Sequence, residues 1–560
     1  MNCSCLGWLL KRIRRRIPGL LLLLLAQVGH ALLLVYFALG SRGVIDSAVA
    51  GDPQGFADAC IYQGKIILGI LLCLTISRHQ NQRLRADLER DWKQQLLRGL
   101  LHGEYAQVSS YHSAELLNRL NNDVDKVNDG ILTILPSTAS MVTKLAAAVL
   151  VLGTLDATFT VAIAGVGAVV VLGTAIMRQK LKELNKRVSD YDGKVSGFLQ
   201  EIMEKLLMVQ AMDVSQEVEH RADGLLNARY DLQRKRKNVS LITNTGVSIM
   251  YYGAGFVALI WCARRLLLGQ MSFGSLTAVI QLVNQLQSPF VNLSGVMPKY
   301  VAMVASAERL MELETIQGEP VLRKEAPEKL YDRMDSICAE GLDFSYDRDQ
   351  ILQDASFVLP KGAFSVITGP SGIGKSTLLK LFLGIFETQR GKLCFHATNE
   401  EIAIDRSTRR MFAYVPQGNL LFSGTLRENL LLAKPDATQA ELEQAIHVSG
   451  MDEFLQQLPL GLDTQLGESG AGLSEGQGQR VAIARAILTG APILLLDECT
   501  SALDEDTEQK VLQRIRELPG RTCIAVTHRP AAIALSDWRL EVQEGKIHAV
   551  CVDLTGESAE

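Results

Sequence analysis

The chain has 560 residues, a formal net charge of −4 and a hydrophobic fraction of 48%. This length allows more than one domain, and the apolar content, with a mean hydropathy of +0.13, is too high for an ordinary pair of soluble domains. The near-neutral charge balance, without a basic stripe in the C-terminal half, argues against nucleic acid as a partner. Apart from a Cys-x-Cys at the N-terminus, the cysteines are scattered without the spacing of a metal site.

Apolar stretches of roughly the ~20 residues that cross a bilayer recur through the N-terminal half. They cover residues 17–40, 59–76, 135–155, 159–177, 242–263 and 275–304. The first stretch follows basic residues, as a secretory signal would, but it is too long for a signal core and lacks a convincing cleavage site. We therefore expect a helical membrane domain with six spans over residues 1–315.

Basic residues predict the orientation of these spans. They cluster before the first span, after the second, after the fourth and before the fifth, whereas the opposite loops contain only Arg42, Arg264 and Arg265. By the positive-inside rule both termini are cytoplasmic, and the expected location is the cell membrane with a multi-pass topology.

Two long loops are expected on the cytoplasmic side. About 58 residues separate spans two and three and about 64 separate spans four and five, with little Pro or Gly. Helical hairpins of this length extend roughly 40 Å beyond the membrane, with turns expected near residues 111–113 and 211–215. They are long enough to contact a soluble domain, or are solvated helices. A polar linker over residues 316–335 follows the sixth span.

Polar residues inside the spans are candidates for substrate contact. Lys144 lies twelve residues before Asp156, about 18 Å from the outer end of its helix and near mid-membrane. In the sixth span a polar group recurs at helical spacing: Gln281, Asn284, Gln285 and Ser288, with Gln287 and Asn292 nearby. This stripe either hydrogen-bonds between helices or lines a wet cavity.

The C-terminal half contains a complete phosphate-binding loop followed by Thr377. Its residues are Gly369, Pro370, Ser371, Gly372, Ile373, Gly374, Lys375 and Ser376. The glycines allow backbone N–H groups to curl around phosphate oxygens, Lys375 supplies charge at the β- and γ-phosphates, and Ser376 faces Mg²⁺. A plain turn is the alternative, but a buried strand before the loop and a helix after it are the context that the motif requires. We expect an α/β P-loop NTPase domain over residues 336–560.

Further motifs in this half resemble those of ATP-binding cassette transporters of the exporter type, as half-transporters with a fused membrane domain and one nucleotide-binding domain. Residues 473–477 read Leu-Ser-Glu-Gly-Gln, similar to the family signature except at Glu475, where glycine is more usual. Residues 494–498 read Leu-Leu-Leu-Asp-Glu, and residues 501–504 match the loop that follows in the family. The resemblance covers nearly the whole chain.

The resemblance implies the roles of the remaining site residues. Glu498 polarises the attacking water, His528 senses the γ-phosphate, and Asp497 and Gln417 join Ser376 around Mg²⁺. Tyr346 stacks on the adenine of ATP, with Phe344 as the neighbouring alternative. ATP and Mg²⁺ are therefore the expected cofactors.

In the family the signature of one subunit contacts the γ-phosphate held by the other. Ser474, Gly476 and Gln477 are therefore expected to complete the site of a second half-transporter subunit, in a homodimer or a heterodimer. The expected activity is ATP-driven export of an amphipathic lipid, drug-like compound or peptide by alternating access. The alternatives are an importer on the same fold, such as siderophore uptake, a regulatory membrane ATPase, and a cassette ATPase of DNA repair or translation. The spans argue against the last.

Overall fold

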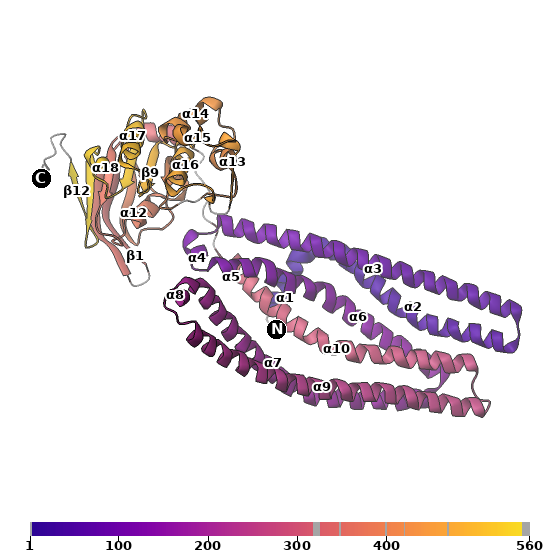
Figure 1. Cartoon of the computed structure of the whole chain (residues 1–560). Coiled ribbons are helices and arrows are strands. Elements are labelled where there is room, and N and C mark those ends of the chain that lie inside the picture. The colour runs from indigo at the N-terminus through magenta and orange to yellow at the C-terminus, as the bar shows by residue number, and fades with distance from the viewer. Residues whose placement is uncertain are drawn as a thin grey trace. The chain divides into compact units, whose positions relative to one another are not determined.

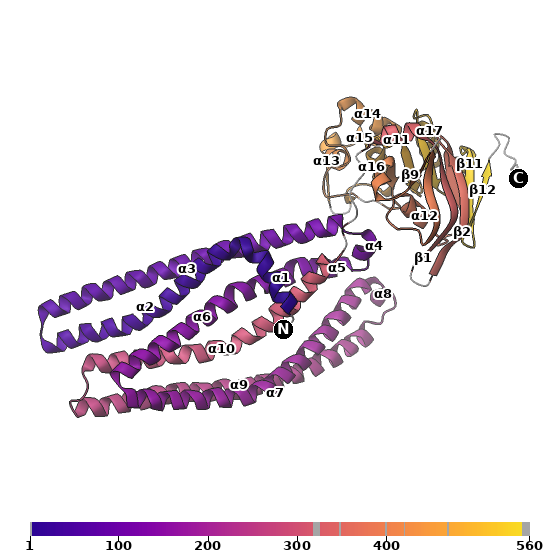
Figure 2. The ribbon, with the colours of Figure 1, turned by 180° about the vertical axis from the view of Figure 1, so that it is seen from behind.

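The computed structural model describes residues 3–316, 318, 325–346, 349–397, 400–418, 421–467 and 470–551. The chain divides into two compact units. The first comprises Met1–Gly99 and His112–Thr315, and the second comprises Leu100–Tyr111 and Ile316–Glu560. Figure 1 labels the elements of each unit, and Figure 2 shows them from behind.

Long helices build the first unit. A short helix α1 (Cys3–Ile13) and the turn η1 (Arg14–Arg16) precede six helices of at least 32 residues each within the described residues. These are α2 (Ile17–Ala50), α3 (Pro53–His102), α6 (Val124–Leu155), α7 (Ala157–Glu204), α9 (Ser215–Leu267) and α10 (Phe273–Glu314). Each contains one predicted span. α7 and α9 run side by side in both views (Figures 1 and 2), joined through α8 (Leu206–Ala211).

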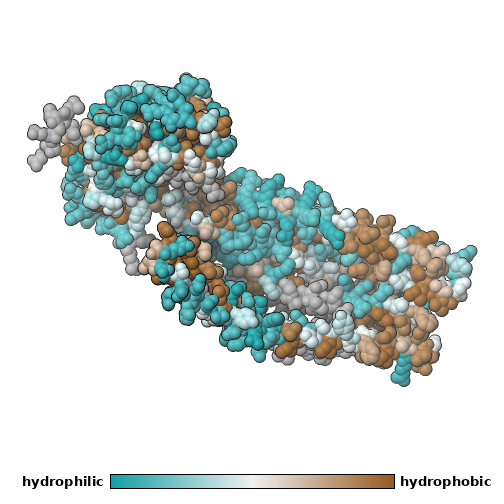
Figure 3. Space-filling view, in the orientation of Figure 1, coloured by the Kyte–Doolittle hydropathy of each residue, from teal (hydrophilic) through white to brown (hydrophobic). Residues whose placement is uncertain are grey.

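Four segments of the described chain are long and apolar enough to cross a membrane: Gly7–Ala50, Pro53–His102, Ser113–Leu155 and Ser215–Leu267. The predicted spans at 159–177 and 275–304 lie in α7 and α10, where many side chains fall outside the described residues, including Gln287, Ser288 and Asn292. Figure 3 shows hydrophobic side chains gathered over the end of the helices that carries the α2–α3 connection, and hydrophilic ones over much of their middle part.

Two aspartates connect helices at the end that carries the α2–α3 connection. Asp156 caps α7 by accepting from the backbone N–H of Phe159 at 3.1 Å, and it also accepts from the indole of Trp261 on α9 at 3.0 Å. Asp46 on α2 accepts from the Ser272 hydroxyl and the Gly274 backbone N–H, both at 2.9 Å. Each carboxylate therefore joins helices that are far apart in sequence.

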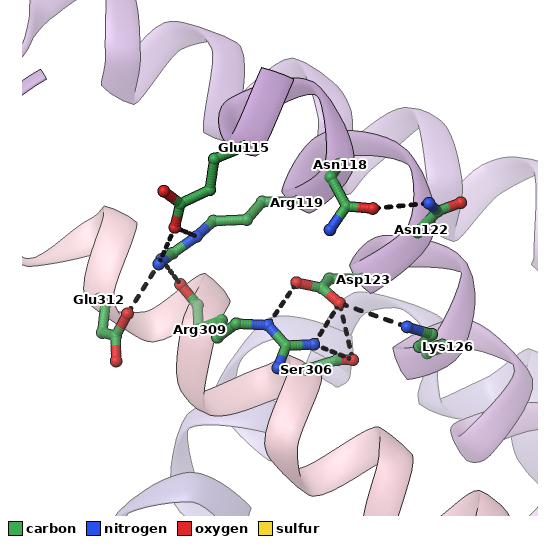
Figure 4. Close-up of polar contacts among 9 residues, drawn as sticks. All are labelled: Glu115, Asn118, Arg119, Asn122, Asp123, Lys126, Ser306, Arg309 and Glu312. Carbon is green, nitrogen blue, oxygen red and sulfur yellow. Dashed lines mark hydrogen bonds and ion pairs between the residues drawn. The ribbon is translucent and has the colours of Figure 1, made fainter. Parts of the chain in front are cut away.

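At the other end, buried charges connect α6 to α10 (Figure 4). A π-helical turn, η2 (Arg119–Asp123), follows α5 (Ser113–Asn118) and places two charged side chains against α10. Asp123 is fully buried and receives two hydrogen bonds from the Arg309 guanidinium, at 2.7 and 2.6 Å, and one from the Ser306 hydroxyl at 2.9 Å. Arg119 donates to Glu115 and Glu312. This group, the Asp123 cluster, neutralises its charges internally.

The first long connection has two breaks, one after α3 and one at residues 110–112, and the second break overlaps the predicted turn near 111–113. The helix α3 ends at His102, and the short helix α4 (Tyr105–Ser109) belongs to the second compact unit. There the Tyr105 ring meets Phe386 edge-on at 6.1 Å between centroids. The second connection turns between residues 205 and 214, around α8, which overlaps the predicted position.

The second unit contains a parallel sheet between two sets of packed side chains. Its six strands run in the order β12-β11-β3-β10-β9-β6, parallel except for β12. They are β3 (Phe364–Thr368), β6 (Phe412–Val415), β9 (Ile493–Asp497), β10 (Thr522–Val526), β11 (Trp538–Gln543) and β12 (Lys546–Cys551). β3, β9 and β10 are buried at every position, which explains their continuous apolar sequences.

A second sheet and a helical layer complete this unit. The antiparallel sheet has the order β2-β1-β4-β5, from β1 (Met334–Tyr346), β2 (Asp349–Pro360), β4 (Arg390–Ala397) and β5 (Glu400–Ala403). It shares one apolar core with α12 (Lys375–Phe382) and the parallel sheet. The opposite core contains α13 (Leu426–Leu431), α14 (Gln439–Val448), α15 (Asp452–Leu455), α16 (Glu475–Leu488) and α17 (Glu505–Arg516).

The smaller elements are α11 (Pro327–Arg333), α18 (Pro530–Ala534), the turns η3 (Arg406–Met411) and η4 (Gly461–Asp463), and the pair β7 (Gly424–Thr425) and β8 (Gln465–Leu466). α11 lies in the range expected as a linker, and its Leu330 and Tyr331 are buried in the core of the second unit.

Candidate nucleotide site

The phosphate loop connects the buried strand β3 to α12. Gly369, Gly372 and Gly374 have φ values of 149°, 81° and 108°, which side chains rarely adopt. A Cβ at Gly374 would also lie 2.2 Å from Ile351 Cγ2. The Lys375 side chain is buried, and its ammonium donates to the carbonyl oxygens of Gly369 and Pro370 at 2.7 and 2.9 Å. The backbone of the loop therefore forms a concave turn that encloses the Lys375 ammonium.

Asp497, at the end of β9, lies against the start of α12. The Ser376 hydroxyl donates to Asp497 Oδ1 at 3.0 Å, and the Tyr414 hydroxyl donates to Oδ2 at 3.0 Å. Asp497 is 2% exposed, and burial raises the pKa of its carboxyl, as does the adjoining charge of Glu498. Burial and the Asp497 carboxylate raise the pKa of Tyr414, so its hydroxyl keeps its proton and donates. Both oxygens of Asp497 are therefore engaged by hydroxyls.

Glu498 is held in a strained conformation. Its φ of 48° lies in the left-handed region, where a non-glycine residue costs of order 1–3 kcal/mol. Its backbone N–H donates to Val526 O at 3.0 Å, and its carboxylate accepts from Gln417 Nε2 at 2.7 Å. The side chain is half-buried. A strained acid at the carboxyl edge of a parallel sheet is consistent with a functional role.

The other predicted residues lie on several different elements. His528 follows β10 and is exposed. On β1, Tyr346 is 37% exposed and its hydroxyl lies 3.4 Å from that of Thr377, beside the phosphate loop, while Phe344 is buried. Tyr346 also meets Phe386 edge-on at 5.3 Å. Of the two aromatic candidates, Tyr346 is therefore the one with an accessible ring.

The signature residues begin α16. Ser474 is its N-cap: its hydroxyl accepts from the Gln477 backbone N–H at 3.3 Å, while the Gln477 side chain accepts from Ser474 N–H at 2.9 Å. A Cβ at Gly476 would approach Ala502 O to 2.7 Å, so this glycine allows contact with the loop after Glu498. Glu475 is exposed, and its φ is not positive, so replacing the usual glycine causes no backbone strain.

Comparison with known proteins matches both units. Residues 18–290 match the family described as ABC transporter transmembrane region, and residues 352–501 match the family described as ABC transporter. The chain belongs to the ABC transporters. It joins an N-terminal ABC transmembrane region to a C-terminal ABC ATPase, so the predicted order of a helical membrane domain and an α/β ATPase domain is confirmed.

Individual ABC transporters cover different shares of the chain. The mycobactin import ATP-binding/permease protein IrtB of Mycolicibacterium smegmatis is 32% identical over 393 residues, 68% of this chain and 66% of that protein. The mitochondrial iron–sulfur clusters transporter atm1 of Aspergillus fumigatus is 32% identical over 349 residues, 61% of this chain. This chain spans about half, 48%, of the length of the Aspergillus protein.

A solved structure extends the likeness to the whole fold. It is that of a bacterial Atm1-family ABC exporter with ATP bound, with a TM-score of 0.76 and 24% identity over 96% of this chain and 94% of the other. The chain therefore has the fold of an ABC exporter.

Several residues of this ABC ATPase escaped the motif analysis. Gln479, on the second turn of α16, is buried and donates to the Ser501 hydroxyl at 3.0 Å while accepting from Ala502 N–H at 3.1 Å. Arg529, next to His528, donates to the carbonyl oxygens of Ser501 and Leu503. The loop after Glu498 is thus fixed from two sides. Its partners lie 22 to 28 residues away, a distance over which sequence spacing gives no signal.

Proposed function

We propose that this chain is an ATP-driven transporter that works as a dimer and exports an amphipathic lipid, drug-like compound or peptide. The observation that carries the proposal is the convergence of the phosphate loop, the buried Asp497 and the strained Glu498 at one edge of the parallel sheet. Such an arrangement suits phosphoryl transfer to water, which depends on positioning and on neutralisation of spreading negative charge.

Within this site the residues have separate tasks. Lys375 and the loop N–H groups bind the phosphates, Glu498 orients and polarises the attacking water, and His528 contacts the γ-phosphate. Gln417, which donates to Glu498, links the conformation of its loop to that carboxylate. The remaining residues of the site, Ser371, Ile373 and Thr377, shape the turn around the phosphates.

Mg²⁺ fits the oxygen donors of the site. Ser376 Oγ and Asp497 Oδ1 are 3.0 Å apart, close to the ~2.9 Å between adjacent oxygens around an octahedral Mg²⁺. A buried carboxylate whose partners in the described chain are hydroxyls also favours a cation beside it. Ser376 and Asp497 would hold the ion, with the amide oxygen of Gln417 nearby. When bound, Mg²⁺ neutralises charge on the phosphates.

Adenine recognition is assigned to Tyr346, because stacking on a flat base contributes roughly 1 to 3 kcal/mol. We expect Tyr346→Ala to raise the apparent ATP constant several-fold while changing the maximal rate less. ATPase kinetics on purified protein provide the measurement. An unchanged constant would contradict the stacking role and direct attention to Phe344.

A second copy of the chain is the proposed partner, with a heterodimer as the alternative. The helix α8 supports this, because its side chains Leu206, Leu207, Met208 and the following Met212 are at least 42% exposed, with Leu207 at 82%. An exposed apolar turn of this kind is expected to be covered by another subunit. Ser474, Gly476 and Gln477 would then face the ATP of that subunit, and the N-terminus of α16 favours phosphate there.

Both termini and the ATPase are assigned to the cytoplasm of the cell by the distribution of basic residues.

Import on the same fold is the second candidate, because a relative is described as a mycobactin import protein. The test is ATP-dependent flux in inside-out vesicles, where an exporter fills the lumen and an importer empties preloaded vesicles. Glu498→Gln is the control: it should retain ATP binding and reduce hydrolysis by about 10² or more. Near-normal hydrolysis in that variant would refute the assignment of Glu498.

A further inference from the structure

The strand β6 and the residues just after it bring two polar side chains to the two neighbouring acids of the nucleotide site. Tyr414 lies on β6, which pairs in parallel with β9, and its hydroxyl donates to Asp497 Oδ2 at 3.0 Å. Three residues later Gln417 donates to the Glu498 carboxylate at 2.7 Å. One short segment of chain therefore contacts both acids, each through a single hydrogen bond from a side chain.

The contact from Tyr414 is well placed to orient Asp497. The ring is half-buried and packs against the core between the two sheets, so the hydroxyl is carried on a rigid support. Asp497 Oδ2 accepts from this hydroxyl, and Oδ1 accepts from Ser376. With one oxygen fixed by Tyr414, the carboxylate cannot rotate without breaking a hydrogen bond in a buried environment, where such a loss is costly.

We propose that Tyr414 is a positioning residue for Asp497, holding the carboxylate so that Oδ1 faces the Ser376 hydroxyl and the cation site between them. The inference rests on the proposed function, because it assigns Asp497 to a divalent cation that accompanies ATP. In this assignment Tyr414 acts through Asp497 and not through a contact of its own with nucleotide or cation. Tyr414 affects the orientation of Asp497, whereas Gln417 contacts Glu498.

The experiment compares binding of a non-hydrolysable ATP analogue to the purified full-length protein in Mg²⁺ and in EDTA. The dissociation constant in EDTA divided by that in Mg²⁺ measures how far the cation strengthens binding, independent of turnover. Tyr414→Phe removes the hydroxyl and keeps the ring, so we expect this ratio to fall about tenfold, as for one hydrogen bond to a charged group. Binding in EDTA should stay within twofold of the wild type.

Tyr331→Phe is the matched control. Tyr331 is a buried tyrosine of the same unit whose hydroxyl lies 2.9 Å from the Thr522 hydroxyl, away from the phosphate loop. This variant should leave the EDTA/Mg²⁺ ratio of dissociation constants unchanged. Thermal unfolding of both variants separates a loss of folding from a loss of positioning, because misfolding weakens binding in both buffers.

The outcomes are distinct. A reduced ratio in Tyr414→Phe alone supports the proposal. An unchanged ratio, or equal weakening in Mg²⁺ and EDTA, overturns it while leaving the proposed function intact. If the wild type itself binds the analogue equally in both buffers, the assignment of Asp497 and Ser376 to Mg²⁺ fails, and the role of Tyr414 fails with it.

Discussion

Two buried aspartates, one in each unit, differ in how their charge is compensated. Asp123 is fully buried, and the Arg309 guanidinium and Ser306 neutralise and satisfy it. Asp497 is 2% exposed, yet the hydrogen bonds that it receives in the described chain come from two neutral hydroxyls. A buried carboxylate that meets a guanidinium directly stabilises the packing of helices, whereas one that meets only neutral hydroxyls directly is expected to cost stability unless a ligand compensates its charge.

The largest expected effect comes from breaking the compensated pair. Arg309→Met removes the guanidinium that hydrogen-bonds to the fully buried Asp123 and leaves only Lys126, at 3.9 Å, as a cation beside it, which should lower the free energy of unfolding by about 3 to 5 kcal/mol. The measurement is thermal or denaturant unfolding of the detergent-solubilised protein. Lys299→Met is the control, because Lys299 pairs with the partly exposed Asp129 at 2.9 Å and its loss should cost at most about 1 kcal/mol.

A double variant sharpens this test. Asp123→Leu together with Arg309→Met removes both charges, and most of the lost stability should return because no uncompensated ion remains. Equal losses in the single and double variants would show that the contribution comes from packing rather than from charge.

Lys144 in the membrane region resembles Asp497 in one respect: it is a charged side chain without an ion pair in the described chain. It is half-buried on α6, one turn before the buried Ala148, and within the described residues it makes no hydrogen bond or ion pair. If it meets an anionic substrate group, Lys144→Met should keep basal ATPase activity but lose stimulation by acidic lipids or peptides. Lys65→Met, at an exposed position of α3, is the control.

Two results would contradict substrate contact by Lys144 and favour a structural role like that of Asp123. One is a lower thermal stability with unchanged substrate preference, as for a lysine with a structural partner. The other is equal stimulation by anionic and neutral compounds in both the wild type and the variant. Proteoliposome ATPase assays across charged and neutral compounds provide the measurement.

The smallest expected effect is a gain in stability, opposite in sign to the loss expected for Arg309→Met. Burial raises the pKa of Asp497, so the folded chain binds this proton more tightly than the unfolded chain does, and stability falls as pH rises above the ordinary value near 3.8. At neutral pH in EDTA, Asp497→Asn should therefore raise the melting temperature, by about 1 to 3 °C. The gain should vanish near pH 4.

Asp436→Asn, at an exposed position of the ATPase unit, should leave the melting temperature unchanged and serves as the control. With Mg²⁺ and ATP present the wild type should gain stability that Asp497→Asn does not. A lower melting temperature for Asp497→Asn in EDTA would mean that its two hydroxyl partners already compensate the charge.

The sequence predicts the ATPase unit in more detail than the helical one, for a physical reason. A phosphate loop requires glycines at fixed spacing and a following helix, so Gly369 to Ser376 reveal their structure locally. Tyr414 donates to an acid 83 residues away, and Asp123 pairs with a residue 186 positions later. Such contacts depend on which elements the fold brings together, and the spacing of residues along one helix or strand contains no trace of them.

The same limit applies to the first long connection. The turn predicted near residues 111–113 overlaps the break between α4 and α5, but the sequence did not predict that α3 already ends at His102. Substrate specificity is hidden in a similar way. Gln281, Asn284 and Gln285 share a face of α10, yet Gln285 donates to Leu34 O at 2.8 Å, which favours the helix-packing alternative at that position.

The assignment of Leu100–Tyr111 to the ATPase unit means that this unit is not one continuous piece of the polypeptide. An ATPase domain cut out at residue 316 would lose Tyr105 and uncover one side of the Phe386 ring. Chimaeras that exchange ATPase domains between relatives face the same difficulty, because Tyr105, which covers this ring, lies far upstream in the membrane-domain half of the sequence. A change at Tyr105 or at Phe386 is therefore expected to require a compensating change at the other residue.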